Sequence, residues 1–433
     1  MRKMKDSGVN WIGLIPVDWK IDNPKYHFTQ RKDRAPQGMV QLTASQKYGV
    51  ITQSEYVERT GANIVTVQKD FDILKLVCAG DFVIHMRSFQ GGLEYSEKTG
   101  SISSAYVMLI PHKTIRVPRY YKWFFKSSNY VDALSSTSNL VRDGQAMRWA
   151  NFIQLPITLP PEEEQNRIAD YLDAKCAEID ALTADIQTQI DTLEQYKRSV
   201  ITEAVTKGLE PDVEMKDSGI AWVGMIPAHW PLHPVYTYFG ERKNKNRFGV
   251  EDNLLSLSYG RVIRKDINTS DGLLPESFNT YNIVEAGDII IRPTDLQNDK
   301  RSLRTGLVKE HGIITSAYID LCPIKEVDSR YFHFLLHASC CANVHKGRTH
   351  FRQPRQKMHP KFVTFSNSEF SRLMVFEPSY DEQVAIADHL DAKCAEIDDT
   401  IAQKQEQLST LEAYKKSLIY EYVTGKKEVS CGE

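Results

Sequence analysis

A long internal repeat is the feature that most constrains how this chain can fold. The segment MKDSGVNWIGLIPVDW, which begins at Met4, recurs almost unchanged from Met215 as MKDSGIAWVGMIPAHW, 211 residues later. A second segment, LDAKCAEID, occurs at Leu172 and again at Leu390, 218 residues apart. Because both ends of each copy match, the chain is a duplication. Two copies of one structural unit are therefore expected in its 433 residues.

The middle parts of the two copies agree only in short islands. AGDFVI at 79–84 matches AGDIII at 286–291, and SSAY at 103–106 matches TSAY at 315–318. β-like runs are predicted at 82–84, 106–110, 289–291 and 318–321, and short amphipathic helices at 120–125 and 331–336. A shared scaffold with a different surface in each copy suits two readers of different targets on one frame.

Two segments, residues 160–208 and 378–426, are predicted to be long helices. Prolines mark both starts, and Gly208 and Gly425 mark the ends. About 40 helical residues would give a rod of roughly 60 Å. Their apolar residues follow the spacing of a coiled-coil seam: Ile168, Leu172, Ile179, Ile186 and Leu193, then Ile386, Leu390, Ile397, Leu411 and Leu418. Such a stripe can also serve a local core, but two matched stripes of this length favour pairing of the helices with each other.

The charge alternates in sign along the chain, although the net charge is only −2. Residues 20–150 carry a net +7 and residues 231–376 a net +6, whereas residues 161–208 carry −6 and residues 377–433 carry −7. A basic block can release counterions from a phosphate backbone, and an acidic block should stay away from it. Chance could produce any one such block, but the same order occurs twice. A partner with a phosphate backbone, such as double-stranded DNA, is therefore expected for the two basic blocks.

The composition is that of a soluble globular protein, with 41% hydrophobic and 25% charged residues. No apolar run reaches the roughly 18 residues that a membrane-spanning helix needs, and the first residues lack the apolar core of a signal peptide. The seven cysteines form no CxxC pair, which favours a reduced compartment and gives no metal-binding spacing. A cytoplasmic protein without membrane contact is expected.

Together these features resemble the specificity subunits of type I restriction-modification enzymes, over essentially the whole chain. The residues that carry the resemblance are MKDSGVNWIGLIP (4–16) and its copy MKDSGIAWVGMIP (215–227), SQKYGVI (45–51), AGDFVIHMRSFQGG (79–92), LPPEEEQNRIADYLDAKCAEID (159–180) and DEQVAIADHLDAKCAEID (381–398). These strings are long, doubled and in the expected order.

The resemblance implies an α+β fold: two globular mixed α/β target recognition domains, separated by two long helices packed as an antiparallel coiled coil, with a pseudo-twofold internal repeat. The recognition domains would be residues 1–159 and 209–377, and the helical regions residues 160–208 and 378–433. Each domain would read one half of a bipartite DNA site. The helices would set the spacing of the half-sites and dock two modification (methyltransferase) subunits, which restriction (translocase and nuclease) subunits join. S-adenosylmethionine, ATP and Mg²⁺ are expected in those partners, and no cofactor in this chain.

Candidates for DNA contact are side chains that can present donors to base edges or phosphates. In the first copy they are Lys47, Tyr48, Arg87, Ser88, Gln90, Arg142, Gln145 and Arg148, with Gly91 and Gly92 permitting close backbone approach. In the second copy they are Ser258, Tyr259, Arg261, Arg292, Thr294, Gln297, Arg301, Arg304, Arg348, Arg352 and Arg355. For any single residue, a solvated charged loop is an equally good interpretation.

Apparent catalytic motifs fail on inspection. Asn23-Pro-Lys-Tyr26 resembles the Asn-Pro-Pro-Tyr of amino-methyltransferases but lacks the second proline and a glycine-rich cofactor loop, and Asp212 and Glu214 are too close in sequence for a nuclease site. There is no ATP-binding phosphate loop and no HExxH motif. Cys176 and Cys394 flank the apolar stripes, so packing explains them. A non-catalytic subunit is expected; the rivals are an enzyme that cuts or methylates DNA alone and a coiled-coil adaptor without a DNA role.

Overall fold

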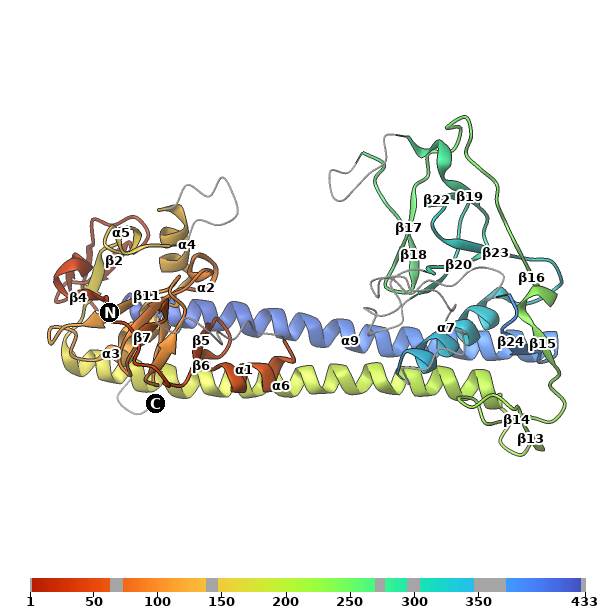
Figure 1. Ribbon diagram of the computed structural model, residues 1–433, viewed down its shortest axis with the longest axis horizontal. Coiled ribbons are helices and arrows are strands. Elements are labelled where there is room, and N and C mark those ends of the chain that lie inside the picture. Colours follow the sequence, from red (N-terminus) through yellow and green to blue (C-terminus); the bar gives the residue numbers. More distant parts are fainter. Residues whose placement is uncertain are drawn as a thin grey trace. The chain divides into compact units, whose positions relative to one another are not determined.

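In the computed structural model, the two repeated helical segments form two long helices (Figure 1). α6 spans Glu162–Lys207 and α9 spans Tyr380–Val423. Both have acidic residues in the first turn, where the negative charge interacts favourably with the positive end of the helix dipole. Both are closely followed by a glycine with a left-handed backbone, Gly208 (φ 74°) and Gly425 (φ 69°). The two predicted long helices are therefore confirmed.

The structure describes residues 2–62, 73–137, 147–268, 277–293, 304–345 and 371–429. The chain divides into two units: unit 1 comprises Met1–Gln187 and Gln405–Glu433, and unit 2 comprises Thr188–Lys404. Each unit holds one mixed α/β domain and a stretch of each long helix. No helix within the described ranges is both long and apolar enough to cross a membrane.

The domain of unit 1 contains a four-stranded antiparallel sheet in the order β4-β11-β8-β9. These strands are β4 (Phe28–Arg31), β8 (Phe82–Ile84), β9 (Glu94–Tyr95) and β11 (Val107–Pro111). Four antiparallel pairs accompany it: β1 (Met4–Asp6) with β2 (Leu14–Pro16), β3 (Lys20–Asp22) with β12 (Ile157–Leu159), β5 (Leu42–Ser45) with β6 (Gly49–Thr52), and β7 (Lys75–Val77) with β10 (Gly100–Ile102). The short helices are α1 (Gln53–Thr60), α2 (Ser88–Gly91), α3 (Pro118–Phe124), α4 (Ser128–Ser136) and α5 (Trp149–Phe152).

The domain of unit 2 repeats this scheme. Its four-stranded sheet has the order β16-β23-β20-β21, formed by β16 (Phe239–Glu241), β20 (Ile289–Ile291), β21 (Thr305–Leu307) and β23 (Ile319–Pro323). The accompanying pairs are β13 (Met215–Asp217) with β14 (Met225–Pro227), β15 (Leu232–Pro234) with β24 (Met374–Phe376), β17 (Leu255–Ser258) with β18 (Arg261–Arg264), and β19 (Asn282–Val284) with β22 (Gly312–Ile314). α7 (Ser329–His345) corresponds to α3. The predicted β runs and short helices lie in β8, β11, β20, β23, α3 and α7.

In unit 1, α6 and α9 pack against each other with opposite chain directions. The rings of Tyr171 and Tyr422 lie 4.5 Å apart. Nine residues further along α6, the carboxylate of Asp180 accepts a hydrogen bond of 2.5 Å from Lys415, which precedes Tyr422 on α9. Residue numbers therefore rise along α6 while they fall along the adjacent part of α9, as in an antiparallel pair.

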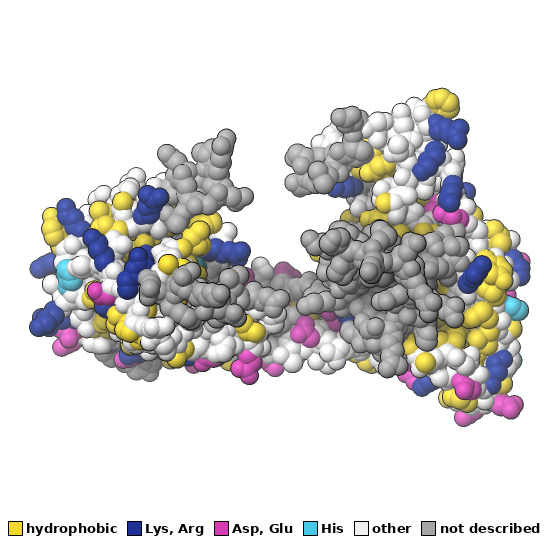
Figure 2. Space-filling model, viewed as in Figure 1, with side chains coloured by type: hydrophobic (Ala, Val, Ile, Leu, Met, Phe, Trp, Pro, Cys, Tyr) yellow, Lys and Arg dark blue, Asp and Glu magenta, His cyan; other side chains and the backbone are white. Residues whose placement is uncertain are grey.

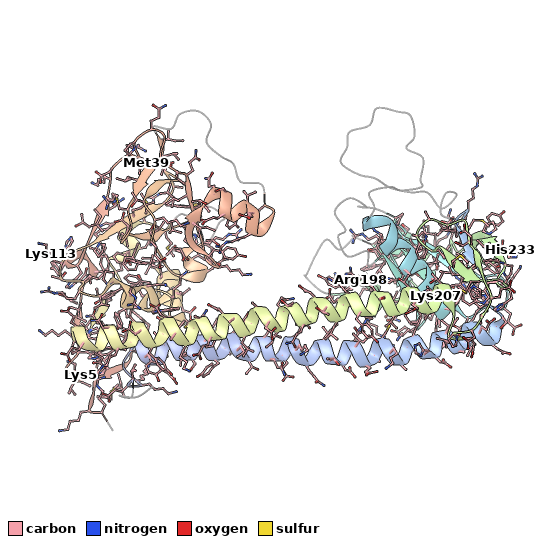
Figure 3. All side chains as sticks on the ribbon, turned by 90° about the horizontal axis from the view of Figure 1, so that it is seen from below. Lys5, Met39, Lys113, Arg198, Lys207 and His233 are labelled. Atoms are coloured by element: carbon pink, nitrogen blue, oxygen red, sulfur yellow. The ribbon has the colours of Figure 1, made fainter. Side chains whose placement is uncertain are left out.

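Unit 2 shows the same antiparallel register. Lys404 donates to Gln189 at 2.5 Å, and Lys197 donates to Asp398 at 2.7 Å. Figures 1 and 3 both show the two helices side by side, with Arg198 labelled on α6 in Figure 3. The predicted fold, two mixed α/β domains with an antiparallel pair of long helices, is confirmed.

The apolar stripes of the helices serve both purposes that the sequence left open. Eight of the ten predicted seam residues are buried, and Leu193 and Leu411 are half-buried. Ile168, Leu172, Ile179 and Leu418 belong to the core of unit 1, and Ile386 and Leu390 belong to the core of unit 2. Toward the domains, the stripes therefore pack into the domain cores as well as against the partner helix.

The domain of unit 1 contacts the beginning of one helix and the end of the other. The indole N–H of Trp19 donates to Glu164 in the first turn of α6 at 2.8 Å. The hydroxyl of Tyr120 donates to the carbonyl of Val423, the last residue of α9, at 2.7 Å. A Cβ at Gly425 would lie 2.5 Å from Pro16, so this close approach requires glycine. Residues of the repeated N-terminal segment thus hold the C-terminal helix end.

Unit 2 has the same contacts with the roles of the helices exchanged. Trp230 donates to Glu382 in α9 at 3.2 Å, and Tyr331 donates to the carbonyl of Val205 in α6 at 3.4 Å. Burial alone would raise the pKa of Glu382, but hydrogen bonds from His229, Ser379 and Trp230 lower that pKa to about 2. The lowered pKa favours the ionised carboxylate, which suits a helix N-terminus.

The two four-stranded sheets differ at one central, buried position. Met108 in β11 lies opposite Val83, and Asp320 in β23 lies opposite Ile290, which is the residue equivalent to Val83. The side chain of Asp320 is 1% exposed, and neither of its oxygens has a hydrogen-bond partner among the described residues. Burial, followed by repulsion from Asp288, raises the pKa of Asp320 to about 8. This carboxyl group is thus protonated in the folded domain at neutral pH.

The unusual pKa of Asp320 predicts a pH-dependent stability of unit 2. An unfolded aspartate titrates near pH 4, so the folded state binds the extra proton between about pH 4 and pH 8. The free energy of unfolding should therefore fall by on the order of 4 kcal/mol between pH 5 and pH 9, and Asp320→Asn should remove this fall. Urea unfolding at both pH values measures it. Asp212→Asn, which changes an exposed acid, is the control, and an Asp320→Asn chain with the wild-type pH dependence would contradict the assignment.

Candidate nucleic-acid interface

In unit 1, three of the predicted contact residues gather around the turn between β5 and β6. The turn residue Gln46 donates to the backbone carbonyl of Arg87 at 2.9 Å, which joins the hairpin to the start of α2. The exposed Lys47 lies 5.4 Å from the ring centre of Tyr48, and Arg59 of α1 lies 5.3 Å from the same ring. The hairpin, α1 and α2 therefore form one surface that combines an aromatic ring with three cations, and Figure 2 shows Lys and Arg side chains over this domain.

Within α2, the predicted contact residues have different environments. Arg87 and Gln90 are exposed. Ser88 is fully buried, and its hydroxyl accepts a hydrogen bond of 2.9 Å from the backbone N–H of His85, so it holds the turn together. A Cβ at Gly91 would lie 2.7 Å from the side chain of Gln46, and one at Gly92 would lie 1.9 Å from the carbonyl oxygen of Phe125. The close approach that these glycines permit is made within the domain itself.

In unit 2, the equivalent hairpin is β17–β18, which carries Ser258, Tyr259 and Arg261. Ser258 pairs with Arg261, so Tyr259 and Gly260 form a two-residue turn. Both have a positive φ, 47° and 79°, as a type I′ turn requires. Tyr259 is the one residue other than glycine with a positive φ in the described ranges, and its side chain is 79% exposed. A strained aromatic residue that is mostly exposed suits a binding role better than a structural one.

The remaining predicted residues fall into three groups. Arg148 is exposed at the start of α5, and Arg292 is half-buried, with its backbone N–H donating to the carbonyl of Arg304 at 2.9 Å. Arg304 is 2% exposed, so the prediction that it contacts a phosphate is wrong for this conformation, because its guanidinium lies inside the domain. Arg142, Gln145, Thr294, Gln297, Arg301, Arg348, Arg352 and Arg355 lie outside the described residues.

The structure adds a candidate that the sequence reasoning missed, the loop between β16 and β17. Phe248 is 88% exposed and Val250 is 83% exposed, and Arg247 beside them is exposed too. Between the two apolar residues, Gly249 has a φ of 60° and turns the chain. The repeat gives a sequence signal for this loop, because the loop begins with Arg-Lys and contains a glycine in both copies. In unit 1 this glycine, Gly38, also has a positive φ. The apolar side chains at this loop tip do not belong to the class of hydrogen-bond donors from which the contact residues were predicted.

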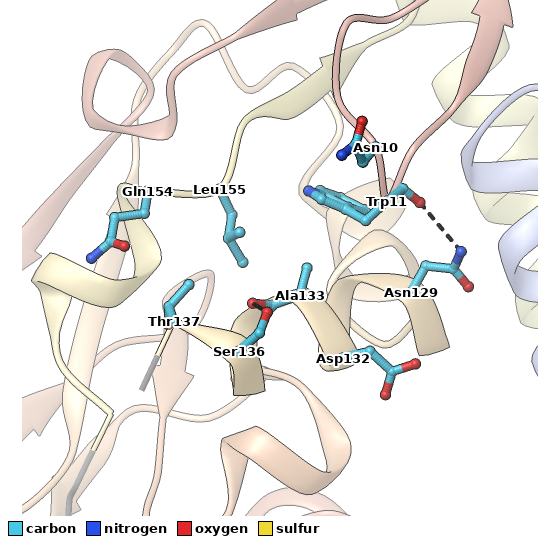
Figure 4. Close-up of a pocket in the computed structure, with 9 residues that line it drawn as sticks. All are labelled: Asn10, Trp11, Asn129, Asp132, Ala133, Ser136, Thr137, Gln154 and Leu155. Carbon is cyan, nitrogen blue, oxygen red and sulfur yellow. Dashed lines mark hydrogen bonds between the residues drawn. The ribbon is translucent and has the colours of Figure 1, made fainter. Parts of the chain in front are cut away.

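A shallow pocket of about 570 Å³ lies in the domain of unit 1. It lies between the repeated N-terminal segment and α4, where Asn129 donates to the carbonyl of Trp11 at 3.2 Å (Figure 4). Asp132 is the one titratable residue that lines it. The other lining residues that the structure describes are amides, hydroxyls and apolar side chains.

The two cysteines of the long helices, Cys176 and Cys394, are buried, as side chains used for packing are. Burial raises the pKa of Cys176 to about 12 and also raises the pKa of Cys394. A thiol is a poor nucleophile under these conditions, because the thiolate is the reactive form. Within the described ranges, no three His, Cys, Asp or Glu side chains are grouped so that they could hold a metal ion.

Two specificity subunits from Methanocaldococcus jannaschii are similar to the chain in sequence, although no family model matches it. The type I restriction enzyme MjaVIII specificity subunit is 22% identical over 440 residues, which cover 96% of this chain and 94% of that protein. The putative type I restriction enzyme MjaX specificity subunit is 24% identical over 240 residues, which cover 51% of this chain. The chain spans about half the length of this second relative, 52%.

A solved chain described under "complex assembly and conformational transition of the type I R-M system" has the same fold. It aligns over 95% of this chain and 99% of its own length, with a TM-score of 0.65 and 11% sequence identity. The resemblance to type I specificity subunits that the sequence predicted is thus confirmed by these two relatives in sequence, and the solved chain shares the fold.

The positive φ of Tyr259 predicts that this residue is held at a cost in stability. An L-residue with a β-carbon in the left-handed region is disfavoured by about 1 kcal/mol, and asparagine tolerates that region better. Tyr259→Asn should therefore raise the free energy of unfolding by about 1 kcal/mol, because little buried area is lost. Urea unfolding measures the change. Tyr48→Asn in the other hairpin is the matched control: it relieves no strain and loses the ring contact with Tyr56 at 6.4 Å, so equal effects of the two changes would contradict the prediction.

Proposed function

We infer that this chain acts as the DNA sequence-specificity subunit of a type I restriction-modification complex. The observation that carries the inference is the duplicated arrangement: each unit presents a hairpin with an aromatic and basic tip on a domain joined to a pair of antiparallel helices. Resemblance in sequence to specificity subunits along 96% of the chain supports it. In this proposal the protein is cytoplasmic, where the DNA lies.

In the proposed role, each domain reads one half of a bipartite DNA site. Arg87 and Gln90 in unit 1 offer the forked donors that suit guanine and adenine edges, and Lys47 suits a phosphate. In unit 2 the equivalent hairpin offers Tyr259 and Arg261 in the place of Lys47 and Tyr48. The two hairpin turns differ, Gln46-Lys47-Tyr48 in unit 1 and Tyr259-Gly260 in unit 2, so the two half-sites would differ in sequence.

The helices would set the distance between the half-sites and dock the partner subunits. Their antiparallel register is held by the buried apolar seam, and a Lys–Asp pair in each unit also spans the two helices. Tyr196 and Tyr414 occupy the same place in the repeat, on α6 and α9, and both are about half exposed, 53% and 52%. Exposed tyrosines are frequent anchors of protein interfaces. Two equivalent anchors suit two identical modification subunits, which restriction subunits would then join.

The chain itself would be non-catalytic, and its partners would supply the reaction. S-adenosylmethionine would bind to the modification subunits, and ATP and Mg²⁺ would be used by the restriction subunits. This role is distinguished from the two alternatives by purified components. Methylation or cleavage by this chain alone would indicate an enzyme, and an assembled complex without salt-dependent DNA binding would indicate an adaptor.

Exchange of one recognition domain tests the proposed division of labour. When residues 20–150 are replaced by the corresponding segment of another specificity subunit, one half-site should change and the other should stay the same. The reason is that these residues contribute to the surface of unit 1 only. Mapping of methylated positions in the DNA of cells that carry the complex measures both halves. A change in both half-sites would contradict modular reading, and the unexchanged chain is the control.

Lengthening of both helices tests the spacing role. Seven residues inserted after Gln187 in α6 and seven after Lys404 in α9 keep the antiparallel register and add about 10 Å of helix, or about 3 base pairs of DNA rise. The half-site sequences should be unchanged and the gap between them longer. Methylation of duplexes with a series of gap lengths measures it. Insertion in one helix alone, which breaks the register, is the control, and a gap that stays the same with both insertions would refute the role.

A further inference from the structure

Asp398 of α9 joins the recognition hairpin of unit 2 to the helix pair. Its carboxylate accepts hydrogen bonds of 2.7 Å from Lys197 of α6 and of 2.7 Å from the guanidinium of Arg261, the first residue of β18. Arg261 follows directly after the exposed Tyr259–Gly260 turn. One side chain on the helix therefore binds both the partner helix and the tip of the hairpin.

The rest of the hairpin is held independently of this ion pair. A Cβ at Gly306 of β21 would lie 2.5 Å from Leu257 and 3.0 Å from Val262, so the middle of the hairpin packs closely on the neighbouring strand. At the end far from the turn, Arg264 forms an ion pair with Glu310. The contact with Asp398 is thus what connects the exposed tip to a defined residue of the long helix.

Unit 1 lacks this connection in the described residues, although the repeat supplies the same helix residues. Asp180 is equivalent to Asp398, and Lys415 is equivalent to Lys197; these two residues form the 2.5 Å pair of unit 1. Asp180 has no ion pair with the β5–β6 hairpin, and its side chain is 63% exposed, against 30% for Asp398. The third partner is therefore specific to unit 2.

We propose that Asp398 is a positioning residue that fixes the recognition hairpin of unit 2 at one place along α9, and with it the position of that half-site relative to the helices. This rests on the proposed function. Arg261 has five N–H donors and uses one nitrogen, Nη2, on Asp398, while its side chain stays 70% exposed. The same guanidinium can therefore bind a DNA phosphate while it stays hydrogen-bonded to Asp398. Charge-assisted hydrogen bonds would then link the DNA, the hairpin and the helix.

The charge of Asp398 supports bridging of this kind. With two cations on one carboxylate, the local group carries a net positive charge, which attracts a phosphate and leaves the ion pairs in place. Were Asp398 instead a competitor that holds Arg261 away from DNA, its removal would strengthen DNA binding. The two roles therefore predict opposite results.

The test compares three variants in the complex assembled with its modification subunits. Asp398→Asn removes the tether, Lys197→Gln removes the helix–helix pair and leaves Arg261 bound, and Asp180→Asn is the matched change in unit 1. Methylation is measured on duplexes whose gap between half-sites is the native length or one base pair shorter or longer. Asp398→Asn should reduce the preference for the native gap about 5-fold or more without changing the half-site sequences, and both other variants should keep the wild-type preference.

Hydrogen–deuterium exchange gives a second readout that does not depend on the proposed function. Asp398→Asn should increase exchange at residues 258–262, and the other two variants should not. An unchanged gap preference, or tighter DNA binding by Asp398→Asn, would overturn the positioning role. If the wild-type complex has no bipartite target at all, the proposed function fails, and the exchange experiment still decides whether Asp398 holds the hairpin.

Discussion

The structure of each unit depends on the way its domain is attached to both long helices. In unit 1, Trp19 binds Glu164 in the first turn of α6, and Tyr120 binds the carbonyl of Val423 at the end of α9. Helix ends have backbone groups without hydrogen-bond partners inside the helix. A side chain of the domain that supplies such a partner therefore stabilises both the helix end and the domain. Because the last helix of the chain completes the core that the first residues begin, unit 1 requires residues from both ends of the sequence.

This attachment explains why the copies match closely at their ends and differ in the middle. The repeated segments supply the residues that face the helices, such as Pro16, which lies against Gly425. A change there would affect the core and both helix ends at once. The exposed turns of the hairpins lie away from these core contacts, so their residues can differ with little effect on the attachment of the domain to the helices. The central position occupied by Met108 or Asp320 shows that even a sheet interior has diverged.

The long helices, their ends and a few of the strands could be predicted because they follow from local periodicity and from duplication. The strand pairing and the environment of single side chains could not, because they depend on residues far apart in sequence. Arg304 is an example: nothing near it in sequence indicates that its guanidinium is buried. Gly91 and Gly92 are another, since the side chain of Gln46 and the backbone of Phe125, which need the space, come from other elements.

The alternation of charge, read from the sequence as basic surfaces for DNA and acidic helices, has a second physical origin. Arg119 forms ion pairs with Asp170 and Asp173 of α6 at 3.0 and 2.6 Å, and Arg330 binds Asp388 and Asp391 of α9 at 2.6 and 3.2 Å. Part of the opposite charge on domains and helices therefore forms ion pairs that attach each domain to its helix. The positive charge left for DNA is smaller than the segment totals suggest, and it is concentrated on exposed side chains. In the proposed role, specificity must then come from a few well-placed groups at the hairpins, because the domain charge as a whole is partly neutralised by the helices.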